Sequence, residues 1–227
     1  MPALFLFALT VQAQDTHSLK SPDGRLEFHL YIHQDTAAGY LPRIAYDLSY
    51  RGKPLLVLSY LGLDIVDQEP FLGENDGLVG FSAHGGSMTA GYMQNGSLGR
   101  KINVEARIAN DGAAFRYIIP RTTALFDMPI NTEMTEFALP VKAEATPAIP
   151  YAAEIPGAAW IAIGEINPGP YPAMRLVSSE GNILTTRFAQ PWDTATPFTT
   201  PWRVVAIGDT RESAIAHLKA FRPFANE

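Results

Sequence analysis

Residues Lys101–Ile119 read KINVEARIANDGAAFRYII, and this stretch decides the fold class. Its first half carries an apolar side chain at every second position, which is the period of a strand with one buried face. The turn residues Asn110-Asp111-Gly112 follow, and a second apolar run, Ala113–Ile119, comes directly after them. Such a turn between two such runs is typical of a β-hairpin. The stretch therefore predicts two neighbouring antiparallel strands.

Short strands separated by turns extend over the rest of the chain. Further strands are predicted at 25–33, 44–50, 55–59, 61–66, 135–139, 160–165, 173–177, 183–188 and 202–207. Residues 71–97 are rich in glycine and are expected to form long loops with one strand at most. Many short strands without helical crossovers favour an antiparallel sandwich or barrel.

A single short helix is predicted after the last strand. Asp209 is the expected N-terminal cap, and Glu212 follows three residues later. Ile215, Leu218 and Phe221 then form an apolar stripe at helical spacing. The sequence thus predicts an all-β domain with a short C-terminal helix.

Composition bounds the class of protein. The 227 residues fit one large all-β domain, and the 47% of hydrophobic residues can bury a substantial core. Net charge is −6 and the Lys and Arg residues are scattered, so the sequence lacks the basic footprint of a nucleic-acid-binding protein. The chain has no cysteine, which excludes disulfides, thiolate zinc sites and cysteine nucleophiles.

Residues 1–13 predict a signal peptide. Ala3–Val11 is a short apolar run, and the small residues around Ala13 suit cleavage directly after it. The alternative interpretation of this run is a buried N-terminal strand. Since no other segment approaches the ~20 apolar residues of a membrane span, we expect a bacterial periplasmic or secreted protein whose residues 14–227 form a single β-sandwich domain.

Ala159–Met174, AWIAIGEINPGPYPAM, is the stretch that points to chemistry. A buried strand ends in the single carboxylate of Glu165, and Pro168, Pro170 and Pro172 then impose a stiff loop. A carboxylate held at a strand end beside a stiff loop suits a metal ligand or a sugar contact. A solvated rim residue gives the same pattern, so both interpretations stay open.

The other polar candidates predict structural roles. His29 and His33 share one side of a strand but lie about 13 Å apart, too far to bind one metal ion. Arg116 stands between apolar neighbours and is expected to pair with a carboxylate across the sheet, with a ligand contact as the alternative. Glu133 and Glu136 would face opposite sides of a strand and form no acid/base pair. The sequence predicts no catalytic residues.

Four large aromatic side chains leave two interpretations open. They could stack on sugar rings or belong to the core, the commoner role. They are Trp160, Tyr171, Trp192 and Trp202.

Six sequence blocks, in this order, resemble the N-terminal domain of glycoside hydrolase family 97, the calcium-dependent α-glucosidases and α-galactosidases of bacteria. The blocks are SPDGRLEF, RGKPLLVLSYLGL, NDGAAFRYIIP, TEMTEFALP, WIAIGEINPGPYPAM and PFTTPWRVVAIGD. The resemblance covers the chain from about Ser21 onward. It implies a large β-sandwich of the galactose-mutarotase kind, a supersandwich, that packs on a following (β/α)8 barrel.

The resemblance also implies a role for Glu165. In the family, the barrel carries the catalytic carboxylates, and one glutamate at the end of an N-domain strand helps to bind Ca²⁺ in the active site. The matching glutamate here is Glu165, followed by Tyr171, Pro172 and Met174. Ca²⁺ takes six to eight oxygen ligands, so Glu165 cannot hold it alone.

These features predict a non-catalytic carbohydrate-binding or structural domain that is inactive by itself. The implied partners are an α-glucoside or α-galactoside and a barrel encoded in the same or an adjacent gene. The residues that would contact carbohydrate are not identified by the sequence. Two alternatives remain: a mutarotase-like sugar isomerase, which needs a His acid such as His84 and a carboxylate base in one cleft, and a subunit that docks on a separately encoded barrel.

Overall fold

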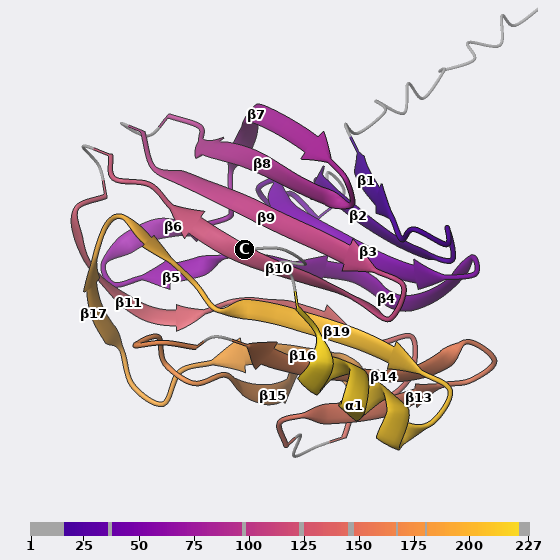
Figure 1. The fold of residues 1–227 in the computed structure, drawn as a ribbon. Helices are drawn as coiled ribbons and strands as arrows, with labels where there is room; N and C mark the ends of the chain where they lie inside the picture. Colours follow the sequence, from indigo (N-terminus) through magenta and orange to yellow (C-terminus); the bar gives the residue numbers. More distant parts are fainter. Residues whose placement is uncertain are drawn as a thin grey trace, which may run out of the picture.

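The computed structural model describes most of the chain. The described residues are 16–35, 38–96, 99–122, 125–144, 148–166, 168–179 and 181–222. The predicted signal peptide over residues 1–13 lies outside these ranges. The described part forms four antiparallel sheets and one helix, which confirms the predicted all-β sandwich with a short C-terminal helix (Figure 1).

Two large sheets make up the layers of the sandwich. The N-terminal sheet has the order β1-β2-β3-β4, with β1 (His17–Lys20), β2 (Leu26–His33), β3 (Arg43–Tyr50) and β4 (Lys53–Tyr60). The long sheet has the order β13-β14-β19-β10-β9-β8-β7, and β18 (Phe198–Thr199) also pairs with β10. Its other strands are β7 (Asp76–His84), β8 (Ser87–Gln94), β9 (Lys101–Ala109), β10 (Gly112–Ile119), β13 (Tyr151–Ile155), β14 (Ala159–Ile166) and β19 (Trp202–Gly208).

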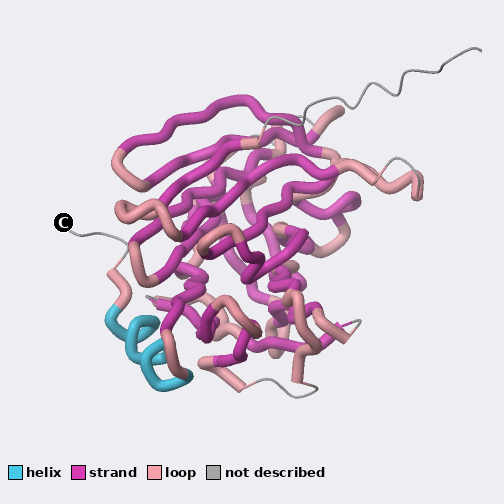
Figure 2. The backbone as a smooth tube through the Cα atoms, turned by 90° about the vertical axis from the view of Figure 1, so that its right-hand side faces the viewer, coloured by secondary structure: helices cyan, strands magenta, loops and turns pink. Residues whose placement is uncertain are grey.

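Two small sheets complete the described architecture. One has the order β17-β11-β5-β6, with β5 (Leu63–Ile65), β6 (Gln68–Leu72), β11 (Asp127–Glu133) and β17 (Trp192–Ala195). The other has the order β12-β16-β15, with β12 (Glu136–Ala138), β15 (Arg175–Ser179) and β16 (Ile183–Arg187). Strands therefore dominate the molecule, and the helix lies at its periphery (Figure 2).

A continuous hydrophobic core lies between the sheets. Alternate residues of β2, such as Leu26, Phe28 and Leu30, are almost fully buried, as the period-2 pattern predicts. Tyr46 links the two layers, because its ring lies 5.5 Å from that of Phe28 and 4.8 Å from that of Phe115 on the long sheet. Such aromatic contacts fix how the two large sheets stack.

The helix α1 (Arg211–Ala220) covers the outer face of β14 and β19 (Figure 1). Leu218 and Phe221 are buried there against Ala162 and Val204. The prediction that Asp209 caps the helix is wrong by one residue. Thr210 is the cap, because its hydroxyl accepts from the Ser213 amide and the Ser213 hydroxyl accepts from the Thr210 amide.

The prediction of long loops over residues 71–97 is also wrong. This segment forms the hairpin β7–β8 at the edge of the long sheet. Small residues such as Gly77, Gly80 and Gly91 weaken the sequence pattern, and β7 exposes Val79 and Phe81 to solvent. An edge strand buries fewer side chains, so alternation is a weaker signal there. Within the described residues, no helix has the length and apolar character needed to cross a membrane.

Candidate functional site

Strands β14 and β19 place opposite charges side by side in the interior. On β14, Ile161 and Ile163 face the core, and Glu165 follows on the same side because side chains alternate along a strand. On β19, Arg203 shares the inner side with Val205. Glu165 and Arg203 are direct cross-strand partners in the antiparallel register. The alternation of the two strands therefore places an ion pair inside the sandwich.

Arg203 binds two carboxylates at once. Its Nη1 donates to Oε2 of Glu165 at 2.5 Å, while its Nε and Nη2 donate to the two oxygens of Glu133 at 2.9 and 2.5 Å. The Arg203 side chain is 1% exposed and that of Glu133 is fully buried. Burial alone would lower the pKa of Arg203, but the neighbouring Glu133 carboxylate outweighs this and raises it above the ordinary value.

Glu133 has two further partners besides the guanidinium. Thr135 donates its hydroxyl to Oε1 at 2.6 Å, and Tyr171 donates its hydroxyl to Oε2 at 2.9 Å. Burial would raise the pKa of Glu133, yet Arg203 and these hydroxyl donors hold it below the ordinary value. We call Arg203, Glu133, Glu165, Thr135 and Tyr171 the ionic network.

The ionic network fixes the proline-rich loop that follows β14. The Met174 amide donates to Oε1 of Glu165 at 3.0 Å, and Tyr171 carries the hydroxyl bound by Glu133. The Tyr171 ring also packs edge-on against Trp192, at 4.9 Å between centroids. The loop is therefore held at both carboxylates, in addition to the backbone restraint that its prolines impose.

Among the three charged residues of the ionic network, Glu165 lies nearest to solvent. Its side chain is 13% exposed, whereas both other charged side chains are 1% exposed or less. Each of its oxygens accepts one hydrogen bond from a described residue, so the carboxylate keeps acceptor capacity for another partner. Glu165 is thus less exposed than a solvated rim residue, and its two oxygens already have partners that a free metal ligand would not have.

The residues of this chain fit one position of a calcium site but not a whole site. Within the ranges that the structure describes, no group of three or more His, Cys, Asp or Glu side chains could hold a metal ion. Calcium needs six to eight oxygen ligands, and Glu133 is committed to Arg203. Glu165 can contribute one carboxylate, and further ligands would have to come from elsewhere.

The remaining sequence candidates take structural roles. Arg116 pairs with Glu105 on the neighbouring strand at 2.7 Å, which confirms the predicted salt bridge. His29 bonds to Asp47 at 2.7 Å and His33 bonds to the Tyr60 hydroxyl at 2.9 Å, so the two imidazoles have separate partners.

The predicted single strand for Glu133 and Glu136 is wrong, because they lie on β11 and β12, respectively. Of the four large aromatic residues, Tyr171 and Trp202 are buried, and Trp160 and Trp192 are half-buried.

Sequence reasoning did not find the central pair of the ionic network. Glu133 and Arg203 are 70 residues apart in the chain. The available signal was Arg203 itself, a cation inside the apolar run WRVVAI, which requires a buried partner. Nothing local to Arg203 identifies Glu133 as that partner.

The fold is a large antiparallel β-sandwich with a short C-terminal helix. Residues 81–152 match the sequence profile of the family described as Glycosyl-hydrolase 97 N-terminal. This match, together with the solved structures below, confirms that the chain resembles the N-terminal domain of glycoside hydrolase family 97. Among curated proteins, none matches the sequence.

Solved structures of two kinds of enzyme share the fold. A variant of a Glycoside Hydrolase Family 97 enzyme from Pseudoalteromonas sp. strain K8 has a TM-score of 0.70 at 19% identity, over 86% of this chain and 36% of its own. The family 97 enzyme from the same strain in complex with acarbose has a TM-score of 0.69 at 19% identity, with the same coverage of both chains.

A β-arabinopyranosidase has a TM-score of 0.66 at 21% identity, over 85% of this chain and 40% of its own. This chain therefore spans well under half of the length of these enzymes. At such identities the likeness establishes the fold.

Proposed function

We propose that this chain is the non-catalytic β-sandwich module of a family 97-type glycoside hydrolase. In this proposal the module packs on a (β/α)8 barrel and supplies Glu165 as one ligand of a calcium site that the barrel completes. The carbohydrate substrate, an α-glucoside or α-galactoside, belongs to the assembled enzyme. Calcium bound there would supply a fixed positive charge beside the reacting sugar.

The ionic network is the observation that carries the proposal. Arg203 fixes one oxygen of Glu165 and the Met174 amide fixes the other, so the carboxylate has little freedom to rotate. A ligand fixed in advance loses less conformational entropy when it binds. Glu133 offsets the charge of Arg203, which leaves Glu165 as the net negative charge of the group. A partly exposed net negative charge attracts a cation. The remaining ligands of that cation would come from the surface that docks on the module.

Activity measurements test the proposal directly. The purified chain is incubated with nitrophenyl α-glucoside or α-galactoside and Ca²⁺, alone and with the barrel encoded in or beside the same gene. We expect no nitrophenol from the chain alone and Ca²⁺-dependent release from the mixture. Glu165→Gln should reduce that release strongly, whereas Glu154→Gln, an exposed glutamate on β13, should not.

Two results would contradict the proposal. Robust nitrophenol release by the chain alone would show that it carries its own catalytic groups. Equal activity of the barrel with and without the chain would remove any role for Glu165. The periplasmic or secreted location remains part of the proposal and is tested by N-terminal sequencing of the exported protein, which should begin after Ala13.

Docking on a separately encoded barrel is the version of this proposal in which the two parts are different polypeptides. A mutarotase-like isomerase gains no comparable support. Among the described residues, the histidine–carboxylate ion pairs join His29 to Asp47 and Glu27, and all three side chains are more than a quarter exposed on the N-terminal sheet. The buried carboxylates Glu133 and Glu105 pair with arginines instead.

A further inference from the structure

A second polar site lies at the opposite end of strands β14 and β19 from Glu165. Ala159 begins β14 and lines this pocket, and the six residues from there to Glu165 span about 20 Å of strand. The pocket has a volume of about 490 Å³, within the range of about 300–1,000 Å³ typical of small-molecule sites. It is separate from the ionic network, and nothing in the proposed barrel docking requires it.

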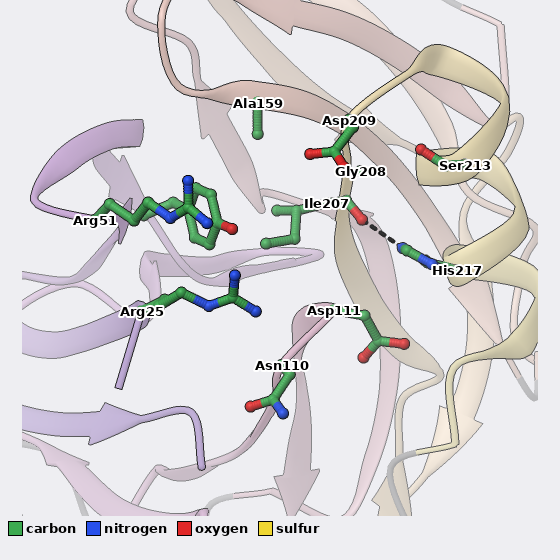
Figure 3. Close-up of a pocket in the computed structure, with 11 residues that line it drawn as sticks. Arg25, Arg51, Asn110, Asp111, Ala159, Ile207, Gly208, Asp209, Ser213 and His217 are labelled. Carbon is green, nitrogen blue, oxygen red and sulfur yellow. Dashed lines mark hydrogen bonds between the residues drawn. The ribbon is translucent and has the colours of Figure 1, made fainter. Parts of the chain in front are cut away.

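Five parts of the chain converge on the pocket, two of which are the start of β14, at Ala159, and the helix α1, at Ser213 and His217 (Figure 3). The loops of the N-terminal sheet contribute Arg25, directly before β2, and Arg51, directly after β3, and the β9–β10 turn contributes Asn110 and Asp111. The end of β19 and the residue after it contribute Ile207 to Asp209. Residues from the sheets and from the helix α1 therefore line the pocket together, and no single loop forms it alone.

The charged residues of the pocket are balanced in sign. Two guanidinium groups, of Arg25 and Arg51, line it together with two carboxylates, of Asp111 and Asp209. Figure 3 shows the Asp209 carboxylate and both guanidinium groups directed into the hollow. A small anion would meet two carboxylates there and a small cation would meet two guanidinium groups. This balance favours a neutral ligand that both donates and accepts hydrogen bonds.

Several of these side chains have unused hydrogen-bonding capacity. Arg25 is already paired, because its Nε and Nη2 bind Oδ2 of Asp23, a residue outside the pocket lining, at 2.7 and 2.5 Å. Arg51, Asp111 and Asp209 form no ion pair within 4 Å with another described residue. The Arg51 guanidinium lies over the Tyr50 ring at 5.0 Å. His217 donates through Nδ1 to the Ile207 carbonyl at 2.6 Å, so this imidazole is fixed at the wall. The pocket thus offers charged donors and charged acceptors across one open space.

We propose that this pocket binds a neutral pyranose sugar. A sugar hydroxyl donates one hydrogen bond and accepts others, so neighbouring hydroxyls can accept from Arg25 or Arg51 while donating to Asp111 or Asp209. Ala159 and Ile207 provide apolar wall for the C–H groups of the ring. The chain would then hold carbohydrate at a site of its own, about 20 Å along the strands from Glu165.

Titration of the full chain with maltose, monitored by saturation-transfer NMR, tests the proposal. We expect saturable, millimolar binding that is weakened about tenfold or more by Asp209→Asn or Arg51→Gln, because each removes a charge-assisted hydrogen bond. Asp127→Asn, at an exposed aspartate on β11, is the matched control and should bind as wild type. Both pocket residues are exposed, so the variants should fold, and thermal unfolding checks this.

The charged sugars glucuronate and glucosamine serve as further probes. Both should bind more weakly than glucose, because each brings a net charge into a balanced pocket. Absence of saturable binding to maltose and glucose, binding unaffected by Asp209→Asn and Arg51→Gln, or tighter binding of glucuronate than of glucose would each overturn the proposal. Glu165→Gln should leave sugar binding unchanged, which separates this site from the calcium role of the proposed function.

Discussion

Charged residues gather at both ends of strands β14 and β19, and the two ends differ in how those charges are satisfied. At one end, Arg203 is buried and bonded to two carboxylates. At the other, Arg51 and Asp209 are exposed and form no ion pair with another described residue. A buried charge without partners costs several kcal/mol, whereas an exposed one is solvated at little cost. The buried end is therefore suited to positioning Glu165, and the exposed end to receiving a ligand.

The largest effect is expected from breaking the buried end. Glu133→Gln leaves Arg203 without its bidentate partner in the interior, so the free energy of unfolding should fall by about 3–5 kcal/mol. Urea unfolding followed by tryptophan fluorescence measures the change. Glu154→Gln, on an exposed position of β13, is the control and should change it by less than about 0.5 kcal/mol. A loss below about 1 kcal/mol for Glu133→Gln would contradict a structural role for the pair.

The lowered pKa of Glu133 also predicts that the protein loses stability in acid. Its pKa lies below the ordinary value of 4.5 because Arg203 outweighs the effect of burial. The stabilisation it provides is present above that ordinary value and disappears as the pH falls through the folded-state pKa. The unfolding free energy of the wild type should therefore decline more steeply in acid than that of Glu133→Gln. Parallel pH profiles would be evidence against the assignment.

A third buried carboxylate, Asp76, sharpens the comparison because it has the opposite pH dependence. It accepts a hydrogen bond from the Gly73 amide at 3.0 Å, and burial raises its pKa to about 7. The native state then retains a proton that the unfolded chain loses near the ordinary pKa of 3.8, so stability should fall as the pH rises from about 4 to 7.

Asp76→Asn removes that ionisation while keeping the side-chain carbonyl as an acceptor. At pH 8 we expect this variant to be more stable than the wild type by about 4 kcal/mol, and at about pH 4 most of the difference should be gone. Urea unfolding at the two pH values measures both quantities. An equal difference at the two pH values would mean that Asp76 is already ionised in the folded protein.

The smallest effect on stability is expected at the pocket end. Arg51→Gln and Asp209→Asn should each change the unfolding free energy by less than about 0.5 kcal/mol, since exposed charges contribute little. The same two substitutions are expected to weaken sugar binding, so stability and binding should separate at this end. A loss of more than about 2 kcal/mol would mean that these residues support the fold instead.

The alternation of apolar and polar residues in the sequence identified the strands that have one buried face and one more exposed face. It predicted β2, β3, β9 and β10 closely, because each places an apolar side chain on the core side at every second residue. It also placed Glu165 at the end of its strand. It could not find the β7–β8 hairpin, where glycines and an exposed edge weaken the pattern.

The candidate site could be predicted only in part, for a physical reason. Glu165 stands beside a loop whose prolines are visible in the sequence, but its partner Arg203 comes from a strand 38 residues later. Glu133 joins them from β11, whose alternation is short and ends at a charged residue. Pairings between distant segments depend on sheet register, and the pocket likewise depends on which turns the fold brings together.

The calcium role of Glu165 is tested by a calorimetric titration of Ca²⁺ into the chain, into the barrel encoded in or beside the same gene, and into their mixture. We expect the mixture to bind Ca²⁺ more tightly than either part, and we expect Glu165→Gln in the chain to remove this gain in affinity. Equal Ca²⁺ affinity for mixtures containing wild-type and Glu165→Gln chains would contradict this role.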